Sequence, residues 1–91
     1  MSEDLKRVCN IFRAKRRDLN LSLKEAENST SIRLGYLEAI EEGSIHQVIA
    51  AVYAIGFMKQ YANFLGIDFD SIVRESPHVF RIPQEKHDFD Y

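Results

Sequence analysis

Apolar residues recur at helical spacing along most of the chain. Within 4–19, Leu5, Val8, Cys9 and Phe12 occupy positions i, i+3, i+4 and i+7, which lie on one face of an α-helix. No segment shows the strict apolar–polar alternation of a half-buried strand. The pattern therefore predicts an all-α fold, in which this segment is the first of five helices.

Two short helices are predicted next, joined by a tight turn. Ser22, with Glu25 three residues later, forms a capping-box pattern for a second helix over about 23–29. Ser31 is a second candidate cap, and it predicts a third helix that ends at Gly43. The apolar side of the third helix consists of Ile32, Tyr36, Leu37 and Ile40. This layout is that of a helix-turn-helix, and a generic helical bundle is the alternative.

The most apolar segment is predicted to form a fourth helix, over about 47–65, with Gly66 as its C-terminal stop. Its apolar arc is about twice as wide as the stripe of an ordinary surface helix. Asp68 then caps a short fifth helix over 69–75. We expect a helix-turn-helix domain over 1–76, followed by a mobile, charged tail over 77–91 that leads toward a linker absent from this chain.

Composition adds constraints and excludes several function classes. The 91 residues suffice for one core, and the net charge of -2 gives no overall attraction to nucleic acid. Cys9 is the only cysteine, and its position on the apolar face of the first helix favours a buried structural thiol. His46, His78 and His87 are not spaced as metal ligands. We therefore expect no enzyme activity, no cofactor and no metal.

The third helix gives mixed signals for DNA binding. Arg33 near its start can recognise a guanine, but Glu38, Glu41 and Glu42 on the same helix would repel phosphates. Phosphate contacts would then come from basic residues of the first helix, namely Arg13, Arg16 and Arg17. The other interpretation of these cations is a solvated face or a face near an anionic membrane, and we favour it over DNA contact.

Aromatic residues on one flank of the fourth helix are a second lead. Tyr53 and Phe57 are one turn apart, at the edge of the apolar arc. Such residues can anchor a protein partner, because they bury a large area with little loss of entropy. Packing in the core is the other interpretation, and the pattern alone does not separate the two. Tyr61 and Phe64 are expected in the core.

Three motifs connect the chain to a known family. They are LSL at 21–23, SIRLGYLEAIEEG at 31–43 and VYAIGFMKQYANFLGID at 52–68. Over about 5–68 the chain resembles the cytoplasmic helix-turn-helix domain of RodZ, a family of bacterial cell-shape proteins. The third motif is the most distinctive, since many repressors share the helix-turn-helix.

The resemblance implies a fold similar to phage-repressor DNA-binding domains, with the bacterial actin MreB as partner. It places the MreB contact on the fourth helix at Tyr53 and Phe57, to which we add Lys59 and Gln60. The implied function is a non-enzymatic adaptor that links MreB to the inner membrane for cell-shape control and division. The membrane segment would lie outside this chain, and we expect a soluble monomer on the cytoplasmic side that does not bind nucleic acid. The alternative is a repressor-like, sequence-specific DNA-binding domain.

The chain departs from the family pattern at four positions. Glu27 replaces a common alanine, and we expect its side chain either to extend outward to solvent or to alter the packing of the second helix on the third. Ile49 and Ala51 replace prolines, which predicts an earlier start of the fourth helix. Ile55 replaces an arginine, which removes a positive charge near the expected contact.

Overall fold

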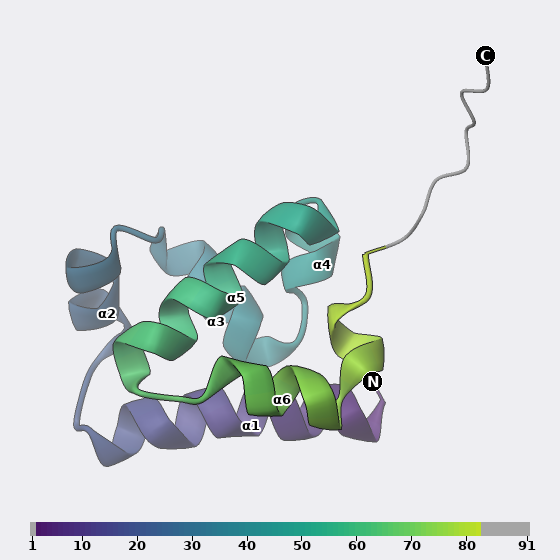
Figure 1. The fold of residues 1–91 in the computed structure, drawn as a ribbon. Coiled ribbons are helices and arrows are strands. Elements are labelled where there is room, and N and C mark those ends of the chain that lie inside the picture. Colours follow the sequence, from purple (N-terminus) through teal and green to yellow (C-terminus); the bar gives the residue numbers. More distant parts are fainter. Residues whose placement is uncertain (1, 83–91) are drawn as a thin grey trace.

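The computed structural model describes residues 2–82, which form six α-helices and one 3-10 helix (Figure 1). The elements are α1 (Glu3–Asp18), α2 (Leu23–Thr30), α3 (Leu34–Glu42), α4 (Ile45–Val48), α5 (Ala51–Leu65), α6 (Phe69–Glu75) and the 3-10 helix η1 (Pro77–Phe80). The predicted all-α class is confirmed.

Most of the helix ends follow the local signals of the sequence. The Ser22 hydroxyl accepts from the Glu25 N–H at 3.0 Å, and the Glu25 carboxylate accepts from the Ser22 N–H at 2.8 Å, which completes the capping box. Gly43 and Gly66 end α3 and α5 with φ angles of 84° and 79°, a conformation that glycine adopts without a steric penalty. Asp68 caps α6 as predicted.

The predicted start of the third helix is wrong by a few residues. Ser31 adopts a left-handed conformation (φ 64°) and ends α2, so it is not a cap for α3. Ile32 is buried within the turn, and α3 begins at Leu34. The Leu34 N–H donates to the Glu27 carboxylate at 2.9 Å. Glu27 of α2 therefore accepts a hydrogen bond from a backbone N–H at the start of α3, which is the role of a local N-cap side chain. This contact explains why a glutamate stands at this position of α2.

The predicted fourth helix over 47–65 is divided into two. Ile49 and Ala50 have extended backbone angles, so α4 ends at Val48 and α5 begins at Ala51. The earlier helix start expected from the missing prolines is therefore wrong, and the described residues contain six α-helices where five were predicted. Ile45 is buried and Ile49 packs against the core. Burial of these two side chains from a short turn is the physical reason for the break.

The core lies among α1, α3 and α5, with α5 crossing the centre of the molecule (Figure 1). The rings of Phe12 and Tyr61 stack with centroids 5.4 Å apart. Tyr61 is fully buried and Phe64 packs against the core, as predicted. Cys9 is also buried, at 4% exposure, which confirms its assignment as a packed thiol. Each large apolar side chain buried here stabilises the fold by about 1.5–3 kcal/mol.

The packed part of the chain continues past the predicted domain boundary at residue 76. Val79 and Phe80 of η1 are buried in the core cluster. The His46 Nε2–H of α4 donates to the Val79 carbonyl at 3.1 Å and so ties η1 to α4. The first residues of the predicted tail therefore belong to the folded domain, whereas 83–91 lie outside the described residues.

Candidate functional site

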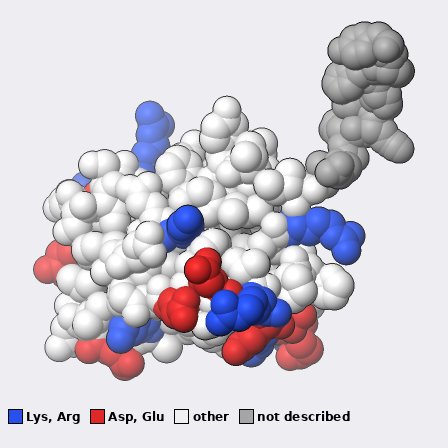
Figure 2. Space-filling model, viewed as in Figure 1, with Lys and Arg blue, Asp and Glu red and all other residues white. Residues whose placement is uncertain are grey.

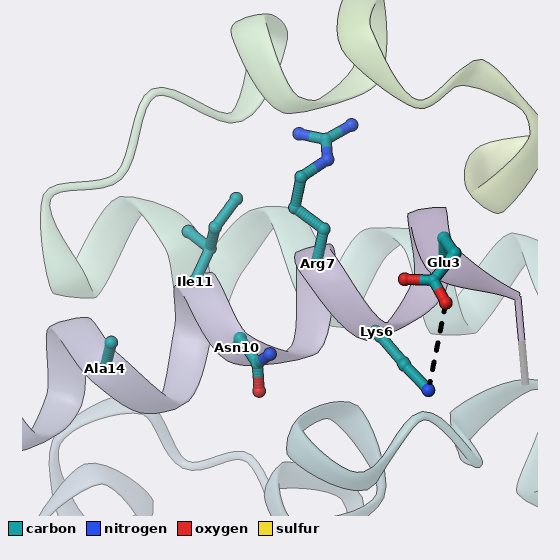
Figure 3. A pocket seen from close by; sticks show the side chains of 6 residues that line it. All are labelled: Glu3, Lys6, Arg7, Asn10, Ile11 and Ala14. Atoms are coloured by element: carbon teal, nitrogen blue, oxygen red, sulfur yellow. Dashed lines mark ion pairs between the residues drawn. The ribbon is translucent and has the colours of Figure 1, made fainter.

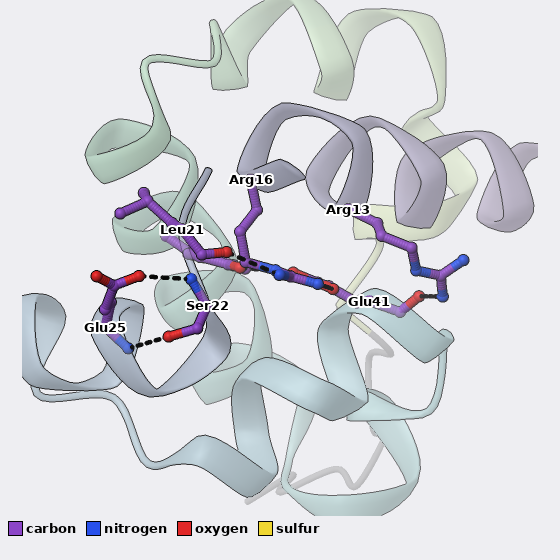
Figure 4. Close-up of polar contacts among 7 residues, drawn as sticks. Arg13, Arg16, Leu21, Ser22, Glu25 and Glu41 are labelled. Carbon is purple, nitrogen blue, oxygen red and sulfur yellow. Dashed lines mark hydrogen bonds and ion pairs between the residues drawn. The ribbon is translucent and has the colours of Figure 1, made fainter. Parts of the chain in front are cut away.

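A buried ion pair with a third polar partner joins α1, α3 and α5. Arg16 contacts Glu41 through two bonds, from Nε to Oε2 at 2.7 Å and from Nη2 to Oε1 at 2.9 Å (Figure 4). The Tyr61 hydroxyl donates to Glu41 Oε2 at 2.6 Å. Only 12% of the Arg16 side chain and 4% of the Glu41 side chain are exposed. The three polar groups thus satisfy one another inside the core.

The contacts with Glu41 shift the pKa values of its two partners, Arg16 and Tyr61. The hydrogen bond that Arg16 donates to the Glu41 carboxylate raises the pKa of Arg16. Burial, and then the hydrogen bond to Glu41, raise the pKa of Tyr61 well above its ordinary value of 10.0. Because the cluster is buried and its atoms already have partners, it serves to lock three helices together and offers no room for a substrate.

The same cluster uses two of the three α1 cations considered as phosphate contacts. Arg13 Nη2 donates to the Glu41 carbonyl at 2.6 Å, and Arg16 Nη1 donates to the Leu21 carbonyl at 2.9 Å (Figure 4). The expectation of a solvated cationic face on the first helix is therefore wrong for both residues. Arg17 and Arg33 are exposed, and they come from different elements, the end of α1 and the residue before α3.

The predicted acidic surface of the third helix is reduced by one residue. Glu41 is 3% exposed and faces the core, so it cannot repel a ligand at the surface as expected. Glu38 and Glu42 are exposed. Two surface glutamates, and not the three predicted, would therefore repel the phosphates of DNA.

A different carboxylate stands at the start of α3. Glu27 accepts from the Leu34 N–H, and its other oxygen lies 2.9 Å from Lys24 Nζ. The hydrogen bond from Lys24, and then that from Leu34, lower the pKa of Glu27. The N-terminus of a helix attracts anions, phosphates among them. In this domain the Glu27 carboxylate occupies the N-terminus of α3, where a phosphate could otherwise bind.

The surface of α1 carries a shallow hollow of about 450 Å³. Its lining residues all come from this one helix: Glu3, Lys6, Arg7, Asn10, Ile11 and Ala14 (Figure 3). Lys6 lies 3.9 Å from Glu3, and Arg7 pairs with Glu75 at 3.2 Å. The hollow contains no nucleophile, and its cations already have acidic neighbours.

Metal and thiol chemistry have little support in the part of the chain that the structure covers. Within residues 2–82 no group of three His, Cys, Asp or Glu side chains could hold a metal ion. Burial raises the pKa of the Cys9 thiol above its ordinary value of 9.0. A thiol with a raised pKa forms less of the reactive thiolate.

Three large, mostly apolar side chains are exposed at the junction of α4 and α5. Val48, Val52 and Tyr53 are 52%, 55% and 66% exposed, and we call these three residues the α4–α5 corner. In Figure 2 most charged side chains gather over α1 and α6, whereas much of the surface over α4 and α5 is uncharged. Large apolar side chains grouped in this way are typical of an interaction site.

The four predicted partner-binding residues have different environments. Tyr53 and Lys59 are exposed on α5. Phe57 is half-buried, and its ring stacks on that of Tyr36 from α3, with centroids 5.3 Å apart and planes 24° apart. Gln60 Nε2 donates to the Thr30 carbonyl at 2.8 Å, which ties α5 to the end of α2. Gln60 therefore has a structural role that the sequence pattern did not indicate.

The buried polar cluster is the feature that sequence reasoning missed, although two signals pointed to it. Glu41 follows Leu37 by four residues and so lies on the buried side of α3. Tyr61 is at the centre of the apolar arc of α5, where its hydroxyl requires a partner. A glutamate on an apolar face and a central tyrosine together predict such a pair.

Comparison with known proteins agrees with this architecture. A family model described as "Helix-turn-helix domain" matches residues 11–72, which is more than half of the chain. The protein named "Uncharacterized membrane protein YmfM" from Bacillus subtilis (strain 168) is 37% identical over 68 residues. That match covers 75% of this chain and 23% of YmfM, so the chain spans about a quarter of that relative. No solved structure matches the chain.

None of the helices in residues 2–82 has both the length and the apolar character needed to cross a bilayer. Domains of the matched family are typically non-enzymatic. With α2 and α3 as its helix-turn-helix unit, this chain belongs to the helix-turn-helix domain family.

Proposed function

We propose that this chain is the domain of a RodZ-like protein that binds the actin-like protein MreB through α5. In this proposal the domain is a non-enzymatic adaptor on the cytoplasmic side of the inner membrane. The remainder of the protein links it to the membrane for cell-shape control and division. The motifs at 31–43 and 52–68 support the family, and the similarity to a protein named as a membrane protein is consistent with the link.

The exposure of Tyr53 is the observation that carries the proposal. This residue is 66% exposed on a helix whose other large aromatic residues, Phe57, Tyr61 and Phe64, are half-buried or buried. Keeping so large an aromatic surface in water has no benefit for the fold of the isolated domain. Aromatic residues of this kind supply much of the binding energy in protein interfaces.

The composition of the surrounding surface also favours a protein partner. Between Gly43 and Ile67 the chain has Lys59 as its only Lys, Arg, Asp or Glu residue. A surface that is apolar with one cation suits a partner with an apolar pocket, and Lys59 would mainly raise the association rate. Since a domain of this size buries about 800 Å² or less, single-site affinity is expected to be modest. Many copies along a filament would then strengthen attachment.

A titration of MreB with matched variants tests the proposal. Tyr53→Ala removes the exposed ring, and the double variant with Phe57→Ala also removes the half-buried one. Leu19→Ala is the control, because Leu19 is 45% exposed and lies outside α5. We expect Tyr53→Ala to weaken binding about tenfold or more and Leu19→Ala to leave it unchanged. Equal binding by folded Tyr53→Ala and the unmodified domain would contradict the proposal.

Sequence-specific DNA binding is the second candidate function. The helix-turn-helix family and the exposed side chain of Arg33 favour it. The internal contacts of Arg13 and Arg16, and the Glu27 carboxylate at the start of α3, oppose it. A duplex screen at low salt separates the two functions, because DNA binding would be tight and would weaken steeply as salt rises.

A further inference from the structure

One aromatic contact joins the proposed binding helix to the helix-turn-helix unit. Tyr36 of α3 and Phe57 of α5 stack with ring centroids 5.3 Å apart and an interplanar angle of 24°. Both side chains are half-buried, so part of the stacked pair remains open to solvent. The pair therefore has a structural face toward the core and a second face at the surface.

The position of Phe57 on α5 places this pair next to Tyr53. The two residues are four apart on one helix, so their side chains lie on the same face, one turn from each other. The Tyr36 ring packs on Phe57 and so restricts the orientations that the Phe57 ring can adopt. An interface residue that is already fixed in its bound orientation loses less entropy on binding.

A glycine precedes each of the two stacked residues in its helix. Gly35 precedes Tyr36, Gly56 precedes Phe57, and a Cβ atom added at either glycine would meet nothing within 4 Å. Both glycines are exposed within helices, where alanine would be the more favourable residue. The open space shows that packing within the domain does not require glycine at either position.

We propose that Tyr36 is a positioning residue of the MreB-binding surface. Stacked on Phe57, it holds that ring beside Tyr53, so the binding surface extends from α5 onto α3. The inference rests on the proposed function, and it adds a residue from the helix-turn-helix unit to a site so far placed on α5 alone.

A double-mutant cycle between Tyr36 and Phe57 tests the inference in the complete chain. Tyr36→Phe keeps the stacked ring, whereas Tyr36→Leu removes it and retains apolar volume. We expect Tyr36→Phe to bind MreB like the unmodified protein and Tyr36→Leu to bind about threefold to tenfold more weakly. In a Phe57→Leu background, Tyr36→Leu should add no further loss, since no ring remains to be positioned.

The outcomes distinguish the inference from the function on which it rests. Unchanged binding by Tyr53→Ala overturns the proposed function. If Tyr53→Ala weakens binding while Tyr36→Leu does not, or if the losses from Tyr36→Leu and Phe57→Leu simply multiply, only the positioning role is overturned.

A second measurement uses the unmodified protein, so that it does not depend on any variant folding. Proton contacts between the Tyr36 and Phe57 rings should be present by NMR both in the free domain and in the complex with MreB. Their loss in the complex would overturn the inference.

Discussion

The helix-turn-helix unit of α2 and α3 and the α4–α5 corner differ in how far their side chains are used within the fold. In the first region, Glu41 pairs with Arg16 of the neighbouring α1, and Glu27 accepts from the backbone N–H at the start of α3. In the second, Val52 and Tyr53 are left more than half exposed. These charged groups of the first region are therefore occupied by internal contacts, whereas the apolar side chains of the second region remain open to a partner.

This difference separates the origin of the fold from the site of function. Charged groups in the first region contribute to holding α1, α3 and α5 together, and their removal should affect stability. Exposed groups in the second region contribute little to the fold, and their removal should affect binding. This separation would be wrong if variants of the charged groups changed only binding, or if variants of the exposed groups changed only stability.

The largest effect on stability is expected from Arg16→Ala. It leaves the buried Glu41 carboxylate without its ion-pair partner, which costs about 3–5 kcal/mol. A domain of this size has a total stability of about 5–10 kcal/mol, so most of it would be lost. Denaturant unfolding measures the change. The exposed Arg17→Ala is the matched control, with an expected change within about 0.5 kcal/mol.

A smaller loss is expected from Tyr61→Phe, which removes the hydroxyl that donates to Glu41 at 2.6 Å. Leaving a buried acceptor with one fewer partner costs about 1–3 kcal/mol. Because the pKa of Tyr61 is raised, this contribution is complete below the ordinary value of 10.0 and is lost as pH rises through the folded pKa. Ultraviolet titration should therefore show a tyrosine that ionises only as the protein unfolds, and that late step should be absent from Tyr61→Phe.

Gly56→Ala should stabilise the domain and weaken its binding. Alanine is favoured over glycine inside a helix by about 0.5–1 kcal/mol, and the added methyl group meets nothing within 4 Å. On the proposed surface the same methyl group would stand between the domain and MreB. Thermal melting and an MreB titration of one sample measure both effects. A stabilised variant that binds normally would exclude Gly56 from the contact.

The smallest effect is expected from Glu27→Gln and depends on pH. The pKa of Glu27 is lowered, so its ionised form contributes stability above the ordinary value of 4.5, and the contribution is lost as pH falls through the folded pKa. Glutamine keeps an oxygen for the Leu34 N–H but does not titrate. The difference in melting temperature between the two proteins should shrink on acidification from about pH 6 to pH 3. A constant difference would show that Glu27 is not ionised in this contact.

Local signals in the sequence predicted the parts of the fold that depend on neighbouring residues. The capping box of Ser22 and the left-handed glycines, Gly43 and Gly66, appear where expected, since each conformation is determined within one turn of helix. The break at Ile49 and Ala50 was missed, because it arises from packing of that segment against the core. Helical periodicity reports which face is apolar, and it does not report whether a long apolar helix is continuous.

The candidate site was predicted in part for the same reason. Tyr53 and Phe57 could be placed on one flank of a helix, but their exposure depends on what packs beside them. Stacking of Tyr36 on Phe57 joins residues 21 positions apart, beyond the reach of any local pattern. The spacing of Glu41 from Leu37 indicates a buried position on α3. Its charge pointed instead to the surface, so the burial was not predicted.

The most direct test of the account is a map of the MreB contact on the isotope-labelled domain by NMR. We predict that the backbone signals of Val48, Val52 and Tyr53 change on addition of MreB, while those of Arg33 and Leu34 at the start of α3 stay unchanged. Changes confined to Arg33 and Leu34, with an undisturbed α4–α5 corner, would contradict the claim that this domain functions through α5.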